Sequence, residues 1–167
     1  MISSFWLIIT IIDKIKECLT LIVKISSTAF ENNDTIPSEF TCDGDDISPP
    51  LAISEVPTET KSLAIVMDDP DAPMGTFTHW VVWNIPPQKT RFIKGEKISY
   101  PQGKTSFGRK SYGGPCPPSG KHRYFFKIYA LNLVLNLKEG SSKADLEKAM
   151  AGHILTEASL IGKYSRR

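Results

Sequence analysis

A histidine and a tyrosine in one short aromatic segment are the side chains best placed for chemistry in this sequence. His122 and Tyr124 lie in the segment HRYFF, which follows directly on a loop rich in glycine and proline, residues 113–120 (GGPCPPSG). Side chains of a strand alternate between its two faces, so these two point one way and Arg123 points the other. Proline fixes the backbone and stiffens the preceding loop. The pattern predicts a small polar site set into an apolar wall.

A second polar segment lies upstream and adds carboxylates and another histidine. Asp68, Asp69 and Asp71 fall in the run DDPDAP, and His79 follows in the run FTHWVVWN. Carboxylates this close repel one another, so at least one must be hydrogen-bonded or paired to stay ionised. We expect Arg123 to pair with one of them, while an aspartate that caps its own turn is the local alternative.

These groups favour anion recognition over metal binding or catalysis. An aspartate can hold an imidazole in one tautomer and leave the outer nitrogen for a ligand. Donors from His79, His122, Tyr124 and the backbone of residues 113–114 suit a phosphate or a carboxylate. The sequence contains no H-x-x-x-H or H-E-x-x-H spacing and no G-x-S-x-G. We therefore predict no metal, no cofactor and no enzymatic activity, and we assign His153 to packing.

Short strands must position these side chains. Residues 62–67 (SLAIVM) predict a buried strand that ends at the acidic run, and residues 78–85 predict the next strand, closed by two prolines. Residues 88–120 predict one long loop system, and loops of that length are usually functional. Residues 123–137 carry the strongest strand pattern and form either one strand or two.

A helix is expected after the strands. Ser142 is a candidate N-cap with Asp145 three residues later, and apolar side chains recur at helical spacing as far as Leu160. Gly162 can end such a helix. Strands first and a helix last predict a mainly β domain with a C-terminal helix rather than alternating β-α units.

Composition limits the partners and the compartment. A chain of 167 residues with a formal charge of +2 suits one domain and shows no general attraction to nucleic acid. Its cysteines are Cys18, Cys42 and Cys116, without C-x-x-C spacing. We expect reduced thiols in a cytoplasmic protein, and a Cys42–Cys116 pair stays open because both residues lie in loops near the predicted site.

Residues 1–24 form a separate extension before a single domain of residues 25–167. Their apolar run is too short to span a bilayer, which needs about 20 residues, and they lack the basic start of a signal peptide. Apolar residues at helical spacing predict an amphipathic helix, which could contact a membrane. The alternative is that the start is assigned too far upstream.

Several separate motifs resemble one family. The blocks DPDAP (residues 69–73), His79-Trp80 and GKHRY (residues 120–124) resemble the signatures of phosphatidylethanolamine-binding proteins. The blocks TCDG, SPPL, YGGPCPP and AMAGH resemble the family's bacterial and archaeal branch, the Raf-kinase-inhibitor-like proteins. The resemblance covers residues 25–165 in the family's order.

This resemblance implies a fold and a pocket. The fold is a central antiparallel sheet packed on a smaller sheet, with a C-terminal helix and a small anion pocket at one edge. By motif position, the residues that the resemblance places at the pocket are Asp69, Asp71, His79, Trp80, Gly114, His122 and Tyr124. It also implies metal-free binding of phosphate-like head groups or phosphorylated ligands, and a homodimer.

Three functions compete at this stage. The first is a non-enzymatic binding protein for a small anionic or phosphorylated ligand. The second is an inhibitor of a protein kinase or a protease that docks through the pocket rim. The third is a hydrolase that uses an Asp–His pair as general base, a role that the sequence supports least because it offers no nucleophile.

Overall fold

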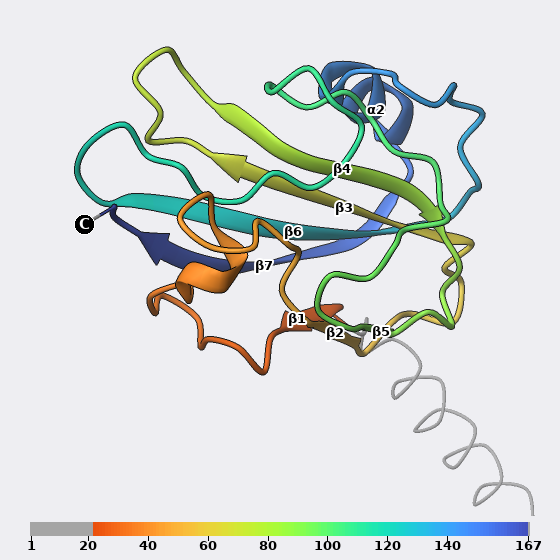
Figure 1. Ribbon diagram of the computed structural model, residues 1–167. Helices are drawn as coiled ribbons and strands as arrows, with labels where there is room; N and C mark the ends of the chain where they lie inside the picture. Colours follow the sequence, from red (N-terminus) through yellow and green to blue (C-terminus); the bar gives the residue numbers. More distant parts are fainter. Residues whose placement is uncertain (1–21, 167) are drawn as a thin grey trace, which may run out of the picture.

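The computed structural model describes residues 22–166, and this part of the chain is mainly β (Figure 1). The helix predicted within residues 1–24 lies outside the described residues, apart from the last three positions. The elements are β1 (Lys24–Ser26), η1 (Ser38–Phe40), β2 (Leu51–Ser54), β3 (Ser62–Asp69), β4 (Phe77–Ile85), β5 (Arg91–Phe92), β6 (His122–Leu131), α2 (Lys143–Met150) and β7 (Ile154–Tyr164).

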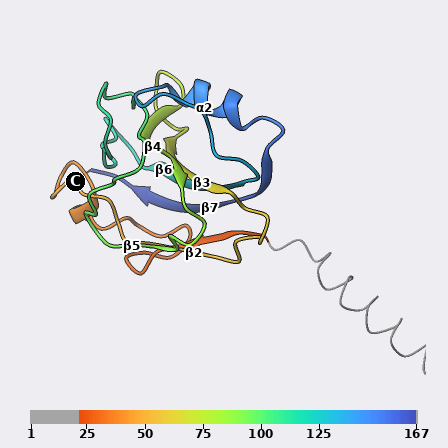
Figure 2. The same ribbon diagram turned by 90° about the vertical axis from the view of Figure 1, so that its right-hand side faces the viewer.

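Two antiparallel sheets form the framework. The larger sheet has the order β4-β3-β6-β7, and the smaller has the order β1-β2-β5. Figure 2 shows the larger sheet lying between α2 on one face and the smaller sheet on the other. The predicted mainly β architecture with a central antiparallel sheet is therefore confirmed.

Each face of the larger sheet has its own apolar core. Every residue of β3 is buried, which agrees with its continuous apolar run. Ile65 and Met67 pack toward the smaller sheet, while the intervening Val66 packs toward α2 with Trp83 and Leu146. The alternation that fills these two cores also decides which acidic side chain at the end of β3 faces which side.

Helix α2 begins as the sequence predicts. Ser142 accepts a hydrogen bond from the Asp145 backbone N–H at 3.1 Å, and the Asp145 carboxylate accepts one from the Ser142 N–H at 2.9 Å. Both bonds of a capping box are thus present. An isolated helix of this length is unstable in water, so the burial of Leu146 and Met150 holds it on the sheet.

The predicted extent of this helix is wrong. It ends at Met150, and the following residues turn back to form β7, which pairs with β6 along its length. Gly152 has a φ of +77°, the left-handed conformation that ends a helix. His153, assigned above to packing on a helix face, is instead an exposed turn residue whose Nδ1 lies 3.0 Å from the side-chain oxygen of Asn132.

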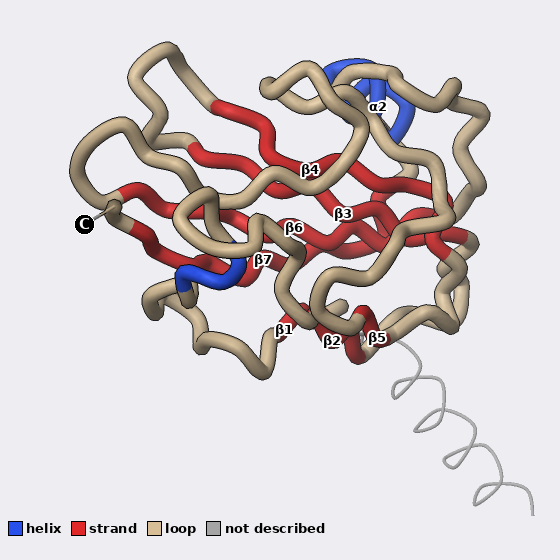
Figure 3. The backbone as a smooth tube through the Cα atoms, viewed as in Figure 1, coloured by secondary structure: helices blue, strands red, loops and turns tan. Residues whose placement is uncertain are grey.

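Residues 88–120 are mostly loop, as predicted, and they run across the outside of the sheets (Figure 3). The strand predicted over residues 123–137 is a single strand that ends at Leu131. Among residues 22–166, no helix has the length and hydropathy needed to cross a bilayer.

The expectation of reduced thiols is also wrong for two cysteines. Cys42 and Cys116 form a disulfide with their Cα atoms 5.4 Å apart. The Cys42 N–H donates to the Pro115 carbonyl at 3.1 Å, so backbone and side chain together join the loop after η1 to the loop before β6.

Candidate anion-binding site

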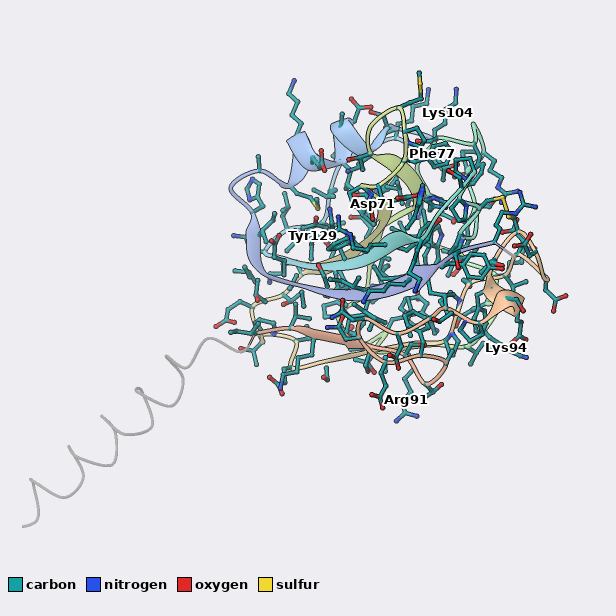
Figure 4. The ribbon with its side chains drawn as sticks, turned by 90° about the vertical axis from the view of Figure 1, so that its left-hand side faces the viewer. Asp71, Phe77, Arg91, Lys94, Lys104 and Tyr129 are labelled. Atoms are coloured by element: carbon teal, nitrogen blue, oxygen red, sulfur yellow. A yellow bond between two sulfur atoms is a disulfide. The ribbon has the colours of Figure 1, made fainter. Side chains whose placement is uncertain are left out.

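The candidate site lies at one end of the larger sheet, where the ends of four strands meet. In the antiparallel register, Asp69 at the end of β3 pairs with Phe77 at the start of β4, and His122 at the start of β6 pairs with Tyr164 near the end of β7. Figure 4 views the molecule from this end, with Asp71 and Phe77 labelled near the strand ends. The fold thus brings the two polar segments of the sequence together.

His122 is held by Asp69. Its Nδ1 lies 2.7 Å from Asp69 Oδ2, and both side chains are buried. The other oxygen, Asp69 Oδ1, accepts the Asp71 N–H at 2.9 Å, which is the local turn considered from sequence. The carboxylate requires the hydrogen on Nδ1, so Nε2 of the neutral imidazole is an acceptor. Only the imidazolium could donate to an anion, which corrects the simpler expectation from sequence.

His79 reaches the same region through a bulge in β4. Met67 pairs with Trp80 and Asp68 pairs with Thr78, so His79 is an extra residue without a partner on β3. A bulge of this kind turns a side chain away from the regular alternation and is frequent next to functional sites.

The loop before β6 holds His79 in place. Nδ1 of His79 donates to the Gly113 carbonyl at 2.7 Å, and the Gly113 N–H donates to the His79 carbonyl at 3.1 Å. The His79 ring meets Tyr124 and Phe107 edge-on, with ring centroids 5.2 and 5.3 Å apart. Burial lowers the pKa of His79, although the Gly113 carbonyl opposes this effect. A neutral His79 therefore also presents an acceptor at Nε2.

Tyr124 supplies a buried hydroxyl that lies near the Asp69 carboxylate. Its oxygen is buried and has no hydrogen-bond partner among the described residues. Burial raises the pKa of Tyr124, and the negative charge of Asp69 raises it further, so the phenol keeps its proton. A buried hydroxyl without a partner costs roughly 1–3 kcal/mol, and a ligand oxygen would relieve that cost.

Asp71 has a different partner from Asp69. Its Oδ1 accepts from Arg123 Nη2 at 2.7 Å, and its Oδ2 accepts from Arg123 Nε and from the Arg123 backbone N–H, each at 2.9 Å. These bonds confirm the predicted pairing of Arg123 with one of the aspartates. They lower the pKa of Asp71 to about 2, so the carboxylate stays ionised at any ordinary pH.

An open hollow of about 500 Å³ covers this end of β6. Its walls are Asp71, Ser119, Gly120, Lys121, His122, Arg123 and Lys163. Of the residues predicted for the site, only Asp71 and His122 line it directly, whereas His79 and Tyr124 are buried.

Two of the predicted residues have other contacts. The Gly114 N–H donates to Asp46 Oδ1 at 2.6 Å, so that amide is already occupied. A Cβ at Gly114 would collide with the Phe40 carbonyl oxygen, so glycine permits a close approach of two loops. Trp80 donates from Nε1 to Gln102 Oε1 at 3.1 Å and lines a separate hollow of about 440 Å³.

Sequence reasoning missed the residues that support the site from distant loops. Asp46 bonds both Gly114 and Arg109, the latter at 2.9 Å, and it has a φ of +54°. Asp46 falls in the acidic run CDGDD, where nothing local indicates a partner 68 positions away. Phe107 covers His79 from the long loop, which also contains Phe92, Tyr100 and Tyr112, so the sequence did not single it out. Among the described residues, no group of three or more potential metal ligands comes together.

Two packed antiparallel sheets with two buried histidines and a buried tyrosine at one sheet end define a class of small β proteins with a polar site at the strand ends. The chain belongs to the phosphatidylethanolamine-binding protein family, whose sequence model matches residues 26–165. The family assignment made from sequence motifs is therefore confirmed.

Relatives and solved structures agree with this assignment. The chain is 50% identical over 155 residues to a UPF0098 protein of Pyrococcus horikoshii, covering 87% of this chain and 77% of that one. A UPF0098 protein of Aquifex aeolicus is 48% identical over 153 residues, covering 87% and 90%. The phosphatidylethanolamine-binding protein homologue CT736 of Chlamydia trachomatis superposes with a TM-score of 0.86 at 41% identity, covering 88% and 99%. YbcL of E. coli gives 0.80 at 28% identity, covering 87% and 99%.

Proposed function

We propose that this protein is a non-enzymatic binding protein whose site takes a phosphate-like group of a small anionic or phosphorylated ligand. The observation that carries the proposal is the Tyr124 hydroxyl, which is buried without a partner beside the His79 ring. His122 stands at the wall of the adjoining hollow with its outer nitrogen available. A ligand oxygen that enters past His122 would give the hydroxyl the partner it lacks.

The tautomers of the two histidines define which ligand fits. Both neutral rings carry hydrogen on Nδ1 and present Nε2 as an acceptor, while Tyr124 presents a donor. A phosphate monoester that keeps one proton can donate to a histidine and accept from the phenol. A fully ionised phosphate would need a histidine to take up a proton first. Binding is therefore coupled to one proton, whichever partner carries it.

A binding role suits the side chains near the hollow better than a catalytic one. Cys42 and Cys116 are joined in a disulfide, so neither can act as a thiolate nucleophile. The Asp69–His122 pair does have the geometry of an oriented general base, with 2.7 Å between Nδ1 and the carboxylate. Because of this pair, hydrolysis by an activated water is retained as the least favoured alternative. Steady turnover of a phosphate ester, abolished by the substitution Asp69→Asn, would establish that activity.

Histidine NMR signals test the binding proposal. The chain has three histidines, and His153 lies exposed near Asn132, outside the site, as an internal control. Titration with inorganic phosphate should shift the His79 and His122 ring signals and leave His153 unchanged. His122→Asn should lose most of the affinity, while His153→Asn should keep it. Equal shifts at all three rings, or unchanged affinity in His122→Asn, would overturn the proposal.

A second candidate function is inhibition of a protein kinase or a protease through the pocket rim. Met74, in the loop between β3 and β4, is fully exposed, and Phe107 beside His79 is 42% exposed. Apolar side chains exposed beside a polar hollow suit contact with a protein partner. Loss of inhibition in Met74→Ser, with phosphate affinity retained, would separate this role from ligand binding.

The cellular location and the oligomeric state of the protein are proposals. The expectation of a cytoplasmic protein rested on reduced thiols, and the disulfide removes that basis because such bonds persist mainly in oxidising compartments. We keep the homodimer as a proposal as well. Light scattering of the purified protein would measure its mass in solution directly.

A further inference from the structure

We propose that Asp46 is a positioning residue for His79 and that it acts through a single peptide group in the loop before β6. Nothing in the sequence near His79 indicates this connection, because Asp46 lies in the loop before β2. The consequence for ligand affinity rests on the proposed function. The effect on the His79 ring does not, since it can be measured in the free protein.

The peptide group between Gly113 and Gly114 links the two side chains. Its carbonyl, on Gly113, accepts from His79 Nδ1 at 2.7 Å. Its N–H, on Gly114, donates to Asp46 Oδ1 at 2.6 Å. A trans peptide group is planar and directs its C=O and its N–H to opposite sides, and the described residues contain no cis peptide bond. Asp46 and His79 therefore hold the two ends of one rigid group.

The charge of Asp46 strengthens the bond to the ring. A hydrogen bond to an ionised acceptor is about twice as strong as one between neutral groups. Hydrogen bonds in a chain polarise one another, so a carboxylate at the N–H makes the carbonyl of the same peptide group a better acceptor. His122 receives its carboxylate directly, from Asp69 at 2.7 Å. Each buried histidine of the site thus has a carboxylate behind Nδ1, and for His79 one peptide group lies between them.

The other oxygen of Asp46 reaches the His79 ring by a second route. Asp46 Oδ2 accepts from Arg109 Nη2 at 2.9 Å. The Arg109 guanidinium lies 5.1 Å from the centroid of the Phe107 ring, and Phe107 meets the His79 ring edge-on with the centroids 5.3 Å apart. Because both routes end at His79, loss of the Asp46 carboxylate would loosen the ring at Nδ1 and at its contact with Phe107.

The backbone holds Asp46 in place. Its φ of +54° lies in the left-handed region, which aspartate tolerates better than most residues. The Asp45 N–H donates to the Glu39 carbonyl at 3.1 Å, and the Cys42–Cys116 disulfide ties this loop to the loop before β6. A strained conformation that its surroundings maintain is typical of functional positions.

Two substitutions separate the acceptor of Asp46 from its charge. Asp46→Asn keeps an oxygen for the Gly114 N–H but removes the charge. Asp46→Gly removes both, and glycine suits the left-handed backbone. Asp45→Gly is the matched control, because it removes the same charge and adds the same backbone freedom one position earlier. Asp45 is exposed, and its side chain forms no hydrogen bond with any of residues 22–166.

The proton on Nδ1 of His79 gives a readout in the free protein by NMR hydrogen exchange. We expect this proton to exchange about tenfold to a hundredfold faster in Asp46→Gly, which corresponds to the loss of one charge-assisted hydrogen bond. Asp46→Asn should be intermediate, and Asp45→Gly should stay within about twofold of the native rate. A loss of stability alone would speed the Nδ1 protons of His79 and His122 alike, so the ratio of the two rates isolates the positioning role.

Titration with inorganic phosphate tests the consequence for binding. Asp46→Gly should bind phosphate about tenfold more weakly than Asp45→Gly, and Asp46→Asn should recover part of that loss. If Asp46→Gly does not fold, the exchange ratio in Asp46→Asn decides.

The two proposals fail in different ways. An unchanged exchange ratio in the Asp46 variants would overturn the positioning role and leave the binding proposal intact. A changed ratio with unchanged phosphate affinity would overturn the consequence for binding. Native His79 and His122 signals that do not move with phosphate would overturn the proposed function, while a changed exchange ratio in Asp46→Gly would still support the positioning role.

Discussion

Replacing Tyr124 with phenylalanine should stabilise the free protein and weaken its ligand binding. The substitution removes only the phenolic oxygen, which is buried and has no hydrogen-bond partner among the described residues. The ring itself stays, with its edge-on contact to His79 at 5.2 Å and its place in the core below the smaller sheet. The change therefore deletes an unsatisfied polar group and leaves the packing almost unaltered.

The expected gain in stability follows from the lack of a hydrogen-bond partner for the Tyr124 hydroxyl. A buried hydroxyl without a partner costs roughly 1–3 kcal/mol, so Tyr124→Phe should raise the free energy of unfolding by about 1 kcal/mol. For a domain of this size, 1 kcal/mol corresponds to a rise in Tm of about 2–4 °C. Loss of one hydrogen bond to a charged ligand should weaken phosphate binding by about 1.5–3 kcal/mol, or roughly tenfold to a hundredfold.

Tyr112 provides the matched control. Its hydroxyl donates to the Phe40 carbonyl at 2.9 Å, so Tyr112→Phe leaves an acceptor without a donor. It should lower the free energy of unfolding by about 1 kcal/mol, the opposite sign to Tyr124→Phe. Urea unfolding of both variants measures the difference, and titration with phosphate measures binding. A Tyr124→Phe variant that is destabilised like Tyr112→Phe and binds phosphate normally would refute the reasoning.

Four further expectations follow from the same contacts. Asp71→Asn should destabilise the protein at pH 7 by only about 1 kcal/mol, because a partly exposed ion pair such as that between Asp71 and Arg123 contributes little. This contribution is present above pH 3.8 and is lost as the pH falls toward 2, so the stability of the variant should fall less steeply in acid. Cys116→Ser should cost up to about 4 kcal/mol in urea unfolding, since the disulfide spans 74 positions. The pKa of His79 in the folded protein lies below 6.5, so as the pH falls below 6.5 the unfolded chain takes up a proton more readily and the protein loses stability. His79→Asn should make this loss less steep. Phe107→Ala should uncover His79 and raise its pKa in an NMR titration, whereas an unchanged pKa would show that other side chains bury it.

The sequence predicts those parts of the fold that depend on local patterns. The capping box of Ser142 and Asp145, the buried run of β3 and the shared face of His122 and Tyr124 all follow from residue order alone. The end of α2 is harder to predict from the sequence, because the apolar residues after Gly152 fit the spacing of a helix and that of a strand equally. In the structure, the left-handed conformation of Gly152 ends the helix, and the following residues form β7 because they pair with β6.

Contacts between distant loops cannot be read from residue order. His79 faces Tyr124 only because β4 carries an extra residue against β3, and that bulge depends on the register of two strands. Gly114 matched the site by motif, yet its amide is occupied by Asp46 from a loop far earlier in the chain. The disulfide likewise joins two loops whose proximity follows from the whole fold.

The acidic run after β3 shows how strand geometry turns one sequence cluster into three separate roles. Asp68 faces α2, where it bonds two lysines at 3.0 and 2.7 Å. Asp69 points to the opposite face and holds His122, while Asp71 lies beyond the strand and pairs with Arg123. The expected repulsion is therefore met by giving each carboxylate its own cation or imidazole. Only Asp69 is bonded to a histidine, so Asp69→Asn should alter ligand affinity most, and a larger effect from the substitution of Asp68 would contradict this division of roles.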